Sequence, residues 1–338
     1  MSLTGDTVDA VDAVDAVDAV DAVDTVDAVD TVDTVDTVDA REAGEVAEHL
    51  PVLPATAWRA AATRHAERVR TLTEGHAARA SAGRHHPVED FLFSYYSLRP
   101  GQLRRWYPGA EVALADAPER AGWRFHRAVG GSTGAPTVAV DLAAFTAARG
   151  AQLDFTVRML SATSAAPGQF GCFGLHEWAM VYRQGADERR HALWRLRLGP
   201  TGTDEVVRDH QIRCTHYDAF RFFTQDARPR NTVQPNLDAR LAMEQPGCLH
   251  AGMDVYKWAY KMIPVVPSEL LLDCFELARS IRELDMRASP YDLSALGYPP
   301  VAIETAEGKA EYVAAQREFG QAAQLLRGRL LAVLRRVS

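Results

Sequence analysis

Three of the four cysteines in this chain are followed within four residues by a histidine. The three pairs are Cys172/His176, Cys214/His216 and Cys248/His250. With 11 histidines in 338 residues, chance would give a particular cysteine such a neighbour only about one time in eight. Thiolate sulfur and imidazole nitrogen are the ligands that zinc and iron prefer in proteins. The pairs therefore predict a zinc or iron site, provided that the fold brings the three segments together.

Two carboxylates accompany these pairs. Glu177 directly follows His176, and Asp254 lies four residues after His250. On one helix, His250 and Asp254 would share a face, so the carboxylate could orient the imidazole for acid–base chemistry or for metal ligation. We therefore take Glu177, Asp254, His176 and His250 as the candidate catalytic residues.

A structural role is the alternative for each Cys–His pair. The chain lacks the Cys-x2-4-Cys spacing that structural zinc sites usually present. A buried cysteine behaves as a small apolar side chain, and a histidine can cap a helix or satisfy a polar group in the core. The sequence also contains no Walker loop, no Gly-x-Ser-x-Gly elbow and no His-Glu-x-x-His motif, so the enzyme classes that these motifs mark are not indicated.

Hydrophobic spacing and capping residues predict that the body of the chain is mainly helical. The expected helices span residues 56–82, 141–164, 174–183, 248–262, 268–287 and 304–336, with an interruption of the second near Gly150. Short β-like runs separated by Pro and Gly predict a small antiparallel sheet around residues 110–140. The predicted fold class is mainly α with a small antiparallel β-sheet (α+β).

The run from Ile212 to Phe223 has two interpretations. As a strand, its alternation would place Cys214, His216 and Asp218 on one face. As a helix, Thr215 and Asp218 would form a capping box.

The N-terminal residues differ in composition from the rest. Residues 8–40 are eleven consecutive Val-Asp-Ala or Val-Asp-Thr triplets, and residues 1–40 contain 12 Asp without Lys or Arg. A period of three matches neither a strand nor a helix, and like charges repel, so we expect a disordered tail over residues 1–50. Residues 51–338 would then form a single, mostly helical domain.

The charge of the body differs in sign from that of the whole chain. The net charge is -8, but the first 40 residues carry -12, so the remaining residues carry +4. A mildly basic body permits contact with duplex DNA without requiring it.

The cellular compartment is suggested by what the sequence lacks. Four dispersed cysteines are too few for the disulfide framework of a small secreted protein, and no apolar run approaches the about 18 residues of a transmembrane helix. The N-terminus has neither the basic start nor the apolar segment of a signal peptide. We therefore expect a cytoplasmic protein without membrane contact.

Four longer segments resemble a known protein family. They are His86–Tyr96, Gly171–Tyr182, Ile212–Phe223 and Glu244–His250. They resemble a bacterial family of proteins of roughly 300 residues that are usually labelled 3-methyladenine DNA glycosylase, and the resemblance runs from about His85 to the C-terminus. It implies a DNA-repair hydrolase that excises alkylated purines from duplex DNA.

Such an excision requires a flipped base, aromatic stacking and a carboxylate that stabilises the sugar cation. Glu177 or Asp254 would supply this carboxylate. The aromatic candidates for the base pocket are Tyr95, Tyr96, Trp178 and Trp258. The candidates for phosphate contacts are Arg104, Arg105, Lys257 and Lys261.

Two further functions stay open from the sequence. One is a metal-dependent helical enzyme that acts on a small molecule through its Cys, His and acidic groups. The other is a non-catalytic protein in which the Cys–His pairs are structural. Convergence of the six Cys and His residues would favour the metal-dependent enzyme, and a basic cleft with exposed aromatic side chains would favour the glycosylase.

Overall fold

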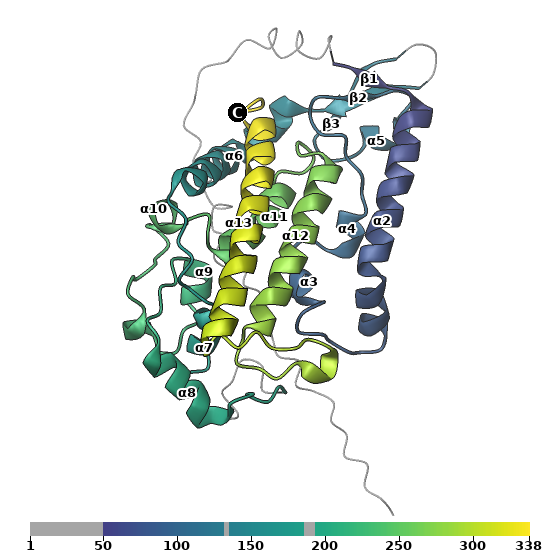
Figure 1. Cartoon of the computed structure of the whole chain (residues 1–338). Coiled ribbons are helices and arrows are strands. Elements are labelled where there is room, and N and C mark those ends of the chain that lie inside the picture. Colours follow the sequence, from purple (N-terminus) through teal and green to yellow (C-terminus); the bar gives the residue numbers. More distant parts are fainter. Residues whose placement is uncertain (1–49, 132–134, 186–192) are drawn as a thin grey trace, which may run out of the picture.

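The computed structural model describes residues 50–131, 135–185 and 193–338. The expected tail over residues 1–50 thus lies outside the described residues, apart from its last position. The described chain consists mainly of helices, with a small sheet at one end (Figure 1). The predicted α+β class is confirmed.

Three helices lie side by side and form the centre of the fold (Figure 1): α11 (Leu249–Lys261), α12 (Ser268–Arg287) and α13 (Ala306–Leu334). Every residue of α11 from Leu249 to Tyr260 is buried, because neighbouring elements cover all sides of this helix. Gly252 permits close packing, since a Cβ atom there would lie 2.9 Å from Cδ1 of Ile281 in α12. The central helix therefore carries His250 and Asp254 into the interior.

Two long helices flank this centre. The first, α2 (Ala55–Ser81), contacts α12, and Arg68 forms ion pairs there with Asp273 and Glu276 at 3.2 and 2.9 Å. The second, α6 (Leu142–Ala165), contacts α13 and begins with the expected cap, because Asp141 Oδ1 accepts a hydrogen bond from the Ala144 amide at 3.0 Å. It is continuous, so the expected interruption near Gly150 is wrong.

The sheet has four strands in the order β1-β2-β4-β3. They are β1 (Val52–Leu53), β2 (Ala113–Leu114), β3 (His126–Gly130) and β4 (Thr137–Val140). β4 pairs antiparallel with both β2 and β3, as the sequence predicts for this region. β1 comes from outside the predicted region and pairs parallel with β2, so the complete sheet is mixed.

Short helices connect these elements. They are α3 (Phe91–Tyr95), α4 (Pro100–Leu103), α5 (Pro118–Ala121), α7 (Leu175–Ala179), α8 (Gly199–Asp209), α9 (Tyr217–Phe220), η4 (Arg228–Arg230), α10 (Arg240–Met243) and η5 (Ser294–Leu296). The helix expected at 174–183 is reduced to the five residues of α7. The ambiguous run from Ile212 is non-helical through His216, with a bridge between Ile212 and Asn231, and becomes helical in α9.

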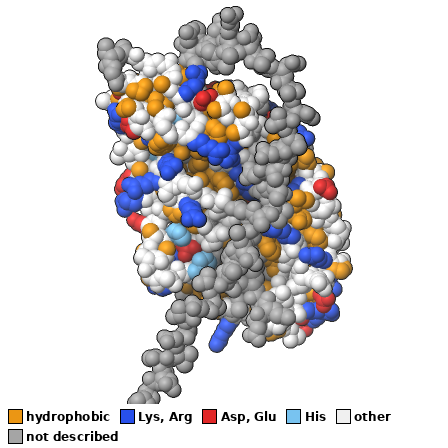
Figure 2. All heavy atoms as spheres, turned by 180° about the vertical axis from the view of Figure 1, so that it is seen from behind, with side chains coloured by type: hydrophobic (Ala, Val, Ile, Leu, Met, Phe, Trp, Pro, Cys, Tyr) orange, Lys and Arg blue, Asp and Glu red, His pale blue; other side chains and the backbone are white. Residues whose placement is uncertain are grey.

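The surface turned away from the view of Figure 1 carries many basic groups. Lys and Arg side chains lie around an apolar area near the middle of that face (Figure 2).

Among the described residues, no helix combines the length and apolar character needed to cross a membrane.

Candidate metal centre

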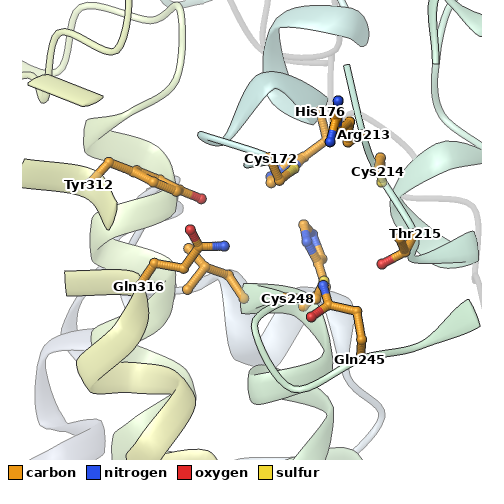
Figure 3. A pocket seen from close by; sticks show the side chains of 11 residues that line it. Cys172, His176, Arg213, Cys214, Thr215, Gln245, Cys248, Tyr312 and Gln316 are labelled. Carbon is orange, nitrogen blue, oxygen red and sulfur yellow. The ribbon is translucent and has the colours of Figure 1, made fainter. Parts of the chain in front are cut away.

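The three Cys–His segments meet at one cavity (Figure 3). Its eleven lining residues are Cys172, His176, Arg213, Cys214, Thr215, Gln245, Cys248, Leu249, His250, Tyr312 and Gln316. The cavity volume is about 10 Å³, which is room for about one water molecule. Five of the six predicted metal ligands thus line one small space, and the sixth, His216, is not among the lining residues.

The Cys172 segment is shaped by two residues with left-handed backbone angles. Phe173 has φ of 50° and Gly174 has φ of 70°, directly before α7 begins. Glycine suits the second position, because a Cβ atom there would lie 3.3 Å from the ring of Tyr312. This turn brings Cys172 back toward His176, so that Cys172 Sγ lies 3.6 Å from His176 Nδ1.

This separation suits two ligands of one metal ion. Zinc–sulfur bonds of about 2.3 Å and zinc–nitrogen bonds of about 2.0 Å, joined at a tetrahedral angle, place sulfur and nitrogen about 3.5 Å apart. Without a metal, the same distance fits a weak hydrogen bond between the thiol and the imidazole. Cys172 and His176 therefore already have the spacing of a ligand pair.

A carboxylate fixes the orientation of His176 from the other side. His176 Nε2 donates a hydrogen bond to Asp285 Oδ1 at 2.7 Å, and Asp285 is fully buried in α12. Burial alone would lower the pKa of His176, but Asp285 outweighs it and the pKa is raised well above its usual value. A metal-binding histidine commonly donates its second N–H to such a carboxylate, which leaves Nδ1 of His176 directed at Cys172.

Asp285 is itself held by an arginine. Arg282 Nη1 donates to Asp285 Oδ2 at 3.1 Å and to Glu177 Oε1 at 3.0 Å, and all three side chains are buried. Glu177, which the sequence suggested as a catalytic carboxylate, is thus an ion-pair partner of Arg282 and does not line the cavity.

Two glutamines clamp the cysteine-bearing loops together. Gln245 Oε1 accepts hydrogen bonds from the amides of Gln169 at 2.8 Å and Gly247 at 2.7 Å. Gln316 Nε2 donates to the Gly247 carbonyl at 2.6 Å. Only glycine fits at 247, since a Cβ atom there would lie 2.4 Å from the Gln169 carbonyl oxygen. The loop before Cys172 and the turn before Cys248 are therefore fixed against each other.

Without a bound cation, this buried environment disfavours the thiolate form of the cysteines. Burial raises the pKa of Cys214 and Cys248, and the nearby Cys172 raises both further. A metal ion reverses this preference, because thiolates bind it directly and release their protons. The donor set of the cavity thus fits a thiophilic cation.

His250 occupies the middle of the histidine cluster. Its ring centroid lies 4.5 Å from that of His176 and 5.3 Å from that of His216. Burial and the neighbouring His176 lower the pKa of His250 well below its usual value, so the ring is neutral and keeps a lone pair. His250 Nδ1 is buried and has no hydrogen-bond partner among the residues that the structure describes.

Two compact sets of possible metal ligands occur within the described ranges of the chain. The first consists of His176, His250 and Asp285, and the second of His216, Glu244 and Asp254, with the ligand atoms of each set within 4.8 Å of one another. Neither set contains a cysteine, so the cavity's thiols do not belong to a set of this compactness among the described residues.

The second set already has two cationic partners, Lys257 and Arg240. We call these five residues together the charge network. Lys257 Nζ lies 2.6 Å from Asp254 Oδ2, and Arg240 Nε lies 3.6 Å from Glu244 Oε1. Burial raises the pKa of Asp254, but Lys257 and His216 outweigh it and the pKa is lowered strongly. Asp254 is thus balanced within the protein, whereas burial raises the pKa of Glu244 and outweighs the neighbouring His216 and Arg240. A metal ion bound by this set would compete with Lys257 and Arg240.

The four aromatic residues predicted for a base pocket do not meet in the cavity. Trp178 is fully buried and its Nε1 donates to the Ala288 carbonyl at 2.9 Å. Tyr96 is buried and donates its hydroxyl to Asp254 at 3.0 Å. Trp258 is also buried, whereas Tyr95 is half-buried and stacks on Phe91.

The four predicted phosphate contacts also differ in their surroundings. Arg104 and Arg105 are exposed directly after α4, and Lys261 is half-buried at the end of α11. Lys257 is buried in the charge network. The structure therefore does not gather these four residues into one surface for DNA.

Several residues of the site were not indicated by the sequence. Asp285 lies on α12, and Tyr312 and Gln316 lie one turn apart on α13. The available signal was their position on the buried face of an amphipathic helix, where polar residues are unusual.

No family model, no curated protein and no solved structure matches the chain.

Proposed function

We propose that the protein is a metal-dependent enzyme whose ion, zinc or iron, binds at the cavity and acts on a small molecule. The observation that carries this proposal is the meeting of three Cys–His segments around a space for about one water molecule. The placed pair of Cys172 and His176 supports it, with Sγ and Nδ1 at 3.6 Å. Cys214, Cys248 and His250 would complete the coordination.

The chemistry of the lining residues limits the choice of metal. Sulfur and imidazole nitrogen favour zinc, iron or copper over magnesium and calcium, which prefer oxygen ligands. The carboxylate nearest to the ligand pair, Asp285, is hydrogen-bonded to His176 and paired with Arg282. Its role is therefore to orient His176 and to increase its basicity.

The test is the metal content of the purified protein, measured by mass spectrometry. We expect about one zinc or iron per chain, and a content below about a tenth of that in Cys172→Ala and Cys248→Ala. Cys274→Ala is the matched control, because Cys274 is buried in α12 and does not line the cavity. Metal-free wild-type protein that still takes up no added zinc or iron would contradict the proposal.

A second candidate is the excision of alkylated purines from DNA, which the sequence resemblance suggests. The basic face in Figure 2 favours contact with a phosphate backbone. A flipped purine needs a pocket far larger than the cavity, so a different site or an opened loop would be needed.

This candidate makes its own measurable claims. It predicts release of 3-methyladenine from methylated DNA, loss of release in Glu177→Gln or Asp254→Asn, and DNA binding that weakens steeply with added salt. Absence of release, together with absence of salt-sensitive binding, would remove it and leave the metal proposal in place.

A further inference from the structure

The cavity has a second wall, which the metal proposal does not use. It is formed by Tyr312 and Gln316, which point from α13 into the cavity opposite the Cys and His side chains (Figure 3). Both side chains are 1% exposed. Thr215 adds a hydroxyl from the extended segment next to Cys214.

The amide of Gln316 can have only one orientation. Its Nε2 donates to the Gly247 carbonyl at 2.6 Å, and a flipped amide would place two acceptor oxygens against each other. Gln316 Oε1 is therefore an acceptor, and it is buried without a hydrogen-bond partner among the described residues. Buried acceptors without a partner are costly, so a donor is expected at this position.

Thr215 also carries a buried oxygen, Oγ1, that lacks a hydrogen-bond partner in the described part of the chain. The two oxygens belong to segments about 100 residues apart, yet both side chains line the same cavity. The Tyr312 hydroxyl lies on the same side of the cavity as the Gln316 amide, and Thr215 lies across the cavity from both (Figure 3). Burial keeps the Tyr312 hydroxyl protonated by raising its pKa well above the usual value.

We propose that Gln316, Tyr312 and Thr215 form a binding site for one small polar ligand that donates a hydrogen bond. The cavity has room for about one water molecule, so this ligand is water or a substrate of similar size that carries a hydroxyl or amino group. The site lies next to the proposed metal ligands, so the inference rests on the proposed function and adds a substrate class to it. A ligand without a donor group would leave Gln316 Oε1 unsatisfied and would bind less tightly.

The test uses protein loaded with Co²⁺, whose visible absorption reports changes in its ligands. Hydroxylamine and azide serve as probes under anaerobic conditions near neutral pH, because they are similar in size but only hydroxylamine carries donor hydrogens there. We expect both to change the spectrum. Gln316→Met should weaken hydroxylamine binding about tenfold, the effect of one buried hydrogen bond, and leave azide binding within about twofold.

Two further variants keep the test independent of folding. Tyr312→Phe and Thr215→Val remove a hydroxyl without breaking any hydrogen bond that the described residues show, and each should weaken hydroxylamine binding several-fold at unchanged cobalt content. Tyr298→Phe is the matched control, because its hydroxyl donates to Glu89 at 2.7 Å and does not line the cavity.

The outcomes separate the two proposals. Failure of the wild type to bind cobalt would overturn the metal centre and this inference together. Cobalt binding with a spectrum that neither probe changes would overturn this inference alone, and so would equal hydroxylamine affinity in the wild type, Gln316→Met and Tyr312→Phe.

Discussion

The cavity and the charge network lie next to each other, and they solve the burial of polar groups in different ways. The rings of His250 and His216 face each other across the boundary at 5.3 Å. In the charge network, Asp254 has Lys257 at 2.6 Å and Tyr96 at 3.0 Å, so its charge is balanced inside the protein.

The cavity differs in composition, because no carboxylate is among its described lining residues. Among its lining residues, His250 Nδ1, Thr215 Oγ1 and Gln316 Oε1 are buried without hydrogen-bond partners in the described chain. Three atoms of the charge network, His216 Nδ1, Glu244 Oε1 and Arg240 Nε, are likewise buried without hydrogen-bond partners in the described chain. The two regions therefore differ in the kind of group they bury: the charge network pairs its carboxylates with Lys257 and Arg240, whereas the cavity is lined mainly by thiols, imidazoles and uncharged polar groups. Proximity of His and acidic side chains alone therefore does not identify a metal site.

The largest expected effect is a fall in melting temperature when a chelator removes the metal from the cavity. A chelator should lower the melting temperature of the wild type by about 10 °C, since a metal at about a thousand times its Kd contributes about 4 kcal/mol to stability. Cys172→Ala should melt at the same temperature with and without the chelator. Scanning calorimetry measures this, and a wild type insensitive to every strong chelator would make the cavity structural rather than metal-binding.

The next effect belongs to the charge network. Lys257→Met should lower the free energy of unfolding by about 3–5 kcal/mol, because Asp254 would stay buried without its cation. The metal content should not change. Urea denaturation measures the loss, and the double variant Lys257→Met/Asp254→Asn should recover part of it. Loss of metal in the single variant would show that the two regions are one site.

A smaller effect tests the link between the cavity and α12. Asp285→Asn should weaken metal binding about 10- to 100-fold, because the amide orients His176 without increasing its basicity. Competition with a chromogenic chelator gives the affinity. Asp273→Asn on the solvent-facing side of the same helix is the control, and an unchanged affinity in Asp285→Asn would contradict the orienting role of Asp285.

The smallest effect concerns Asp90, an acid that belongs to neither region. Burial raises the pKa of Asp90, but hydrogen bonds from Arg79 at 2.6 Å and His76 at 3.0 Å outweigh it, and the pKa is lowered. A depressed pKa contributes stability that is present above the unfolded pKa of about 3.9 and is lost as the pH falls through the folded pKa.

Asp90→Asn should therefore cost about 1.5 kcal/mol at pH 7 and less at pH 3. Urea denaturation at both pH values measures it, and a constant difference would show that the charge of Asp90 does not matter. This variant should leave the metal content unchanged, which separates acid denaturation of the fold from acid release of the metal.

The sequence alone determined the long helices and singled out three segments that the fold brings to one cavity. The ranges 248–262 and 268–287 predict α11 and α12 to within one residue at each end, because apolar periodicity and Pro267 are local signals. The Asp141 cap, which begins α6, is another local signal. The three Cys–His segments were also evident, since their residue types favour metal binding wherever they lie.

Tertiary structure decided which groups complete the site. His176 and Asp285 are 109 residues apart in sequence, and Tyr312 and Gln316 come from the last helix, where a polar residue on a buried face has no local pattern that predicts its partner. The direction of Cys172 depends on the left-handed angles of Phe173 and Gly174, which the sequence permits but does not require.

The dependence on long-range packing also explains why some predicted site residues do not line the cavity. Glu177 forms an ion pair with Arg282, and Trp178 is buried with its Nε1 donating to the Ala288 carbonyl, although these are the two residues that follow His176 in sequence. Successive side chains on a short helix point about 100° apart, so neighbours in sequence need not share a site. Residue type determined the chemistry that this chain can perform, and long-range packing determined which of those residues face each other.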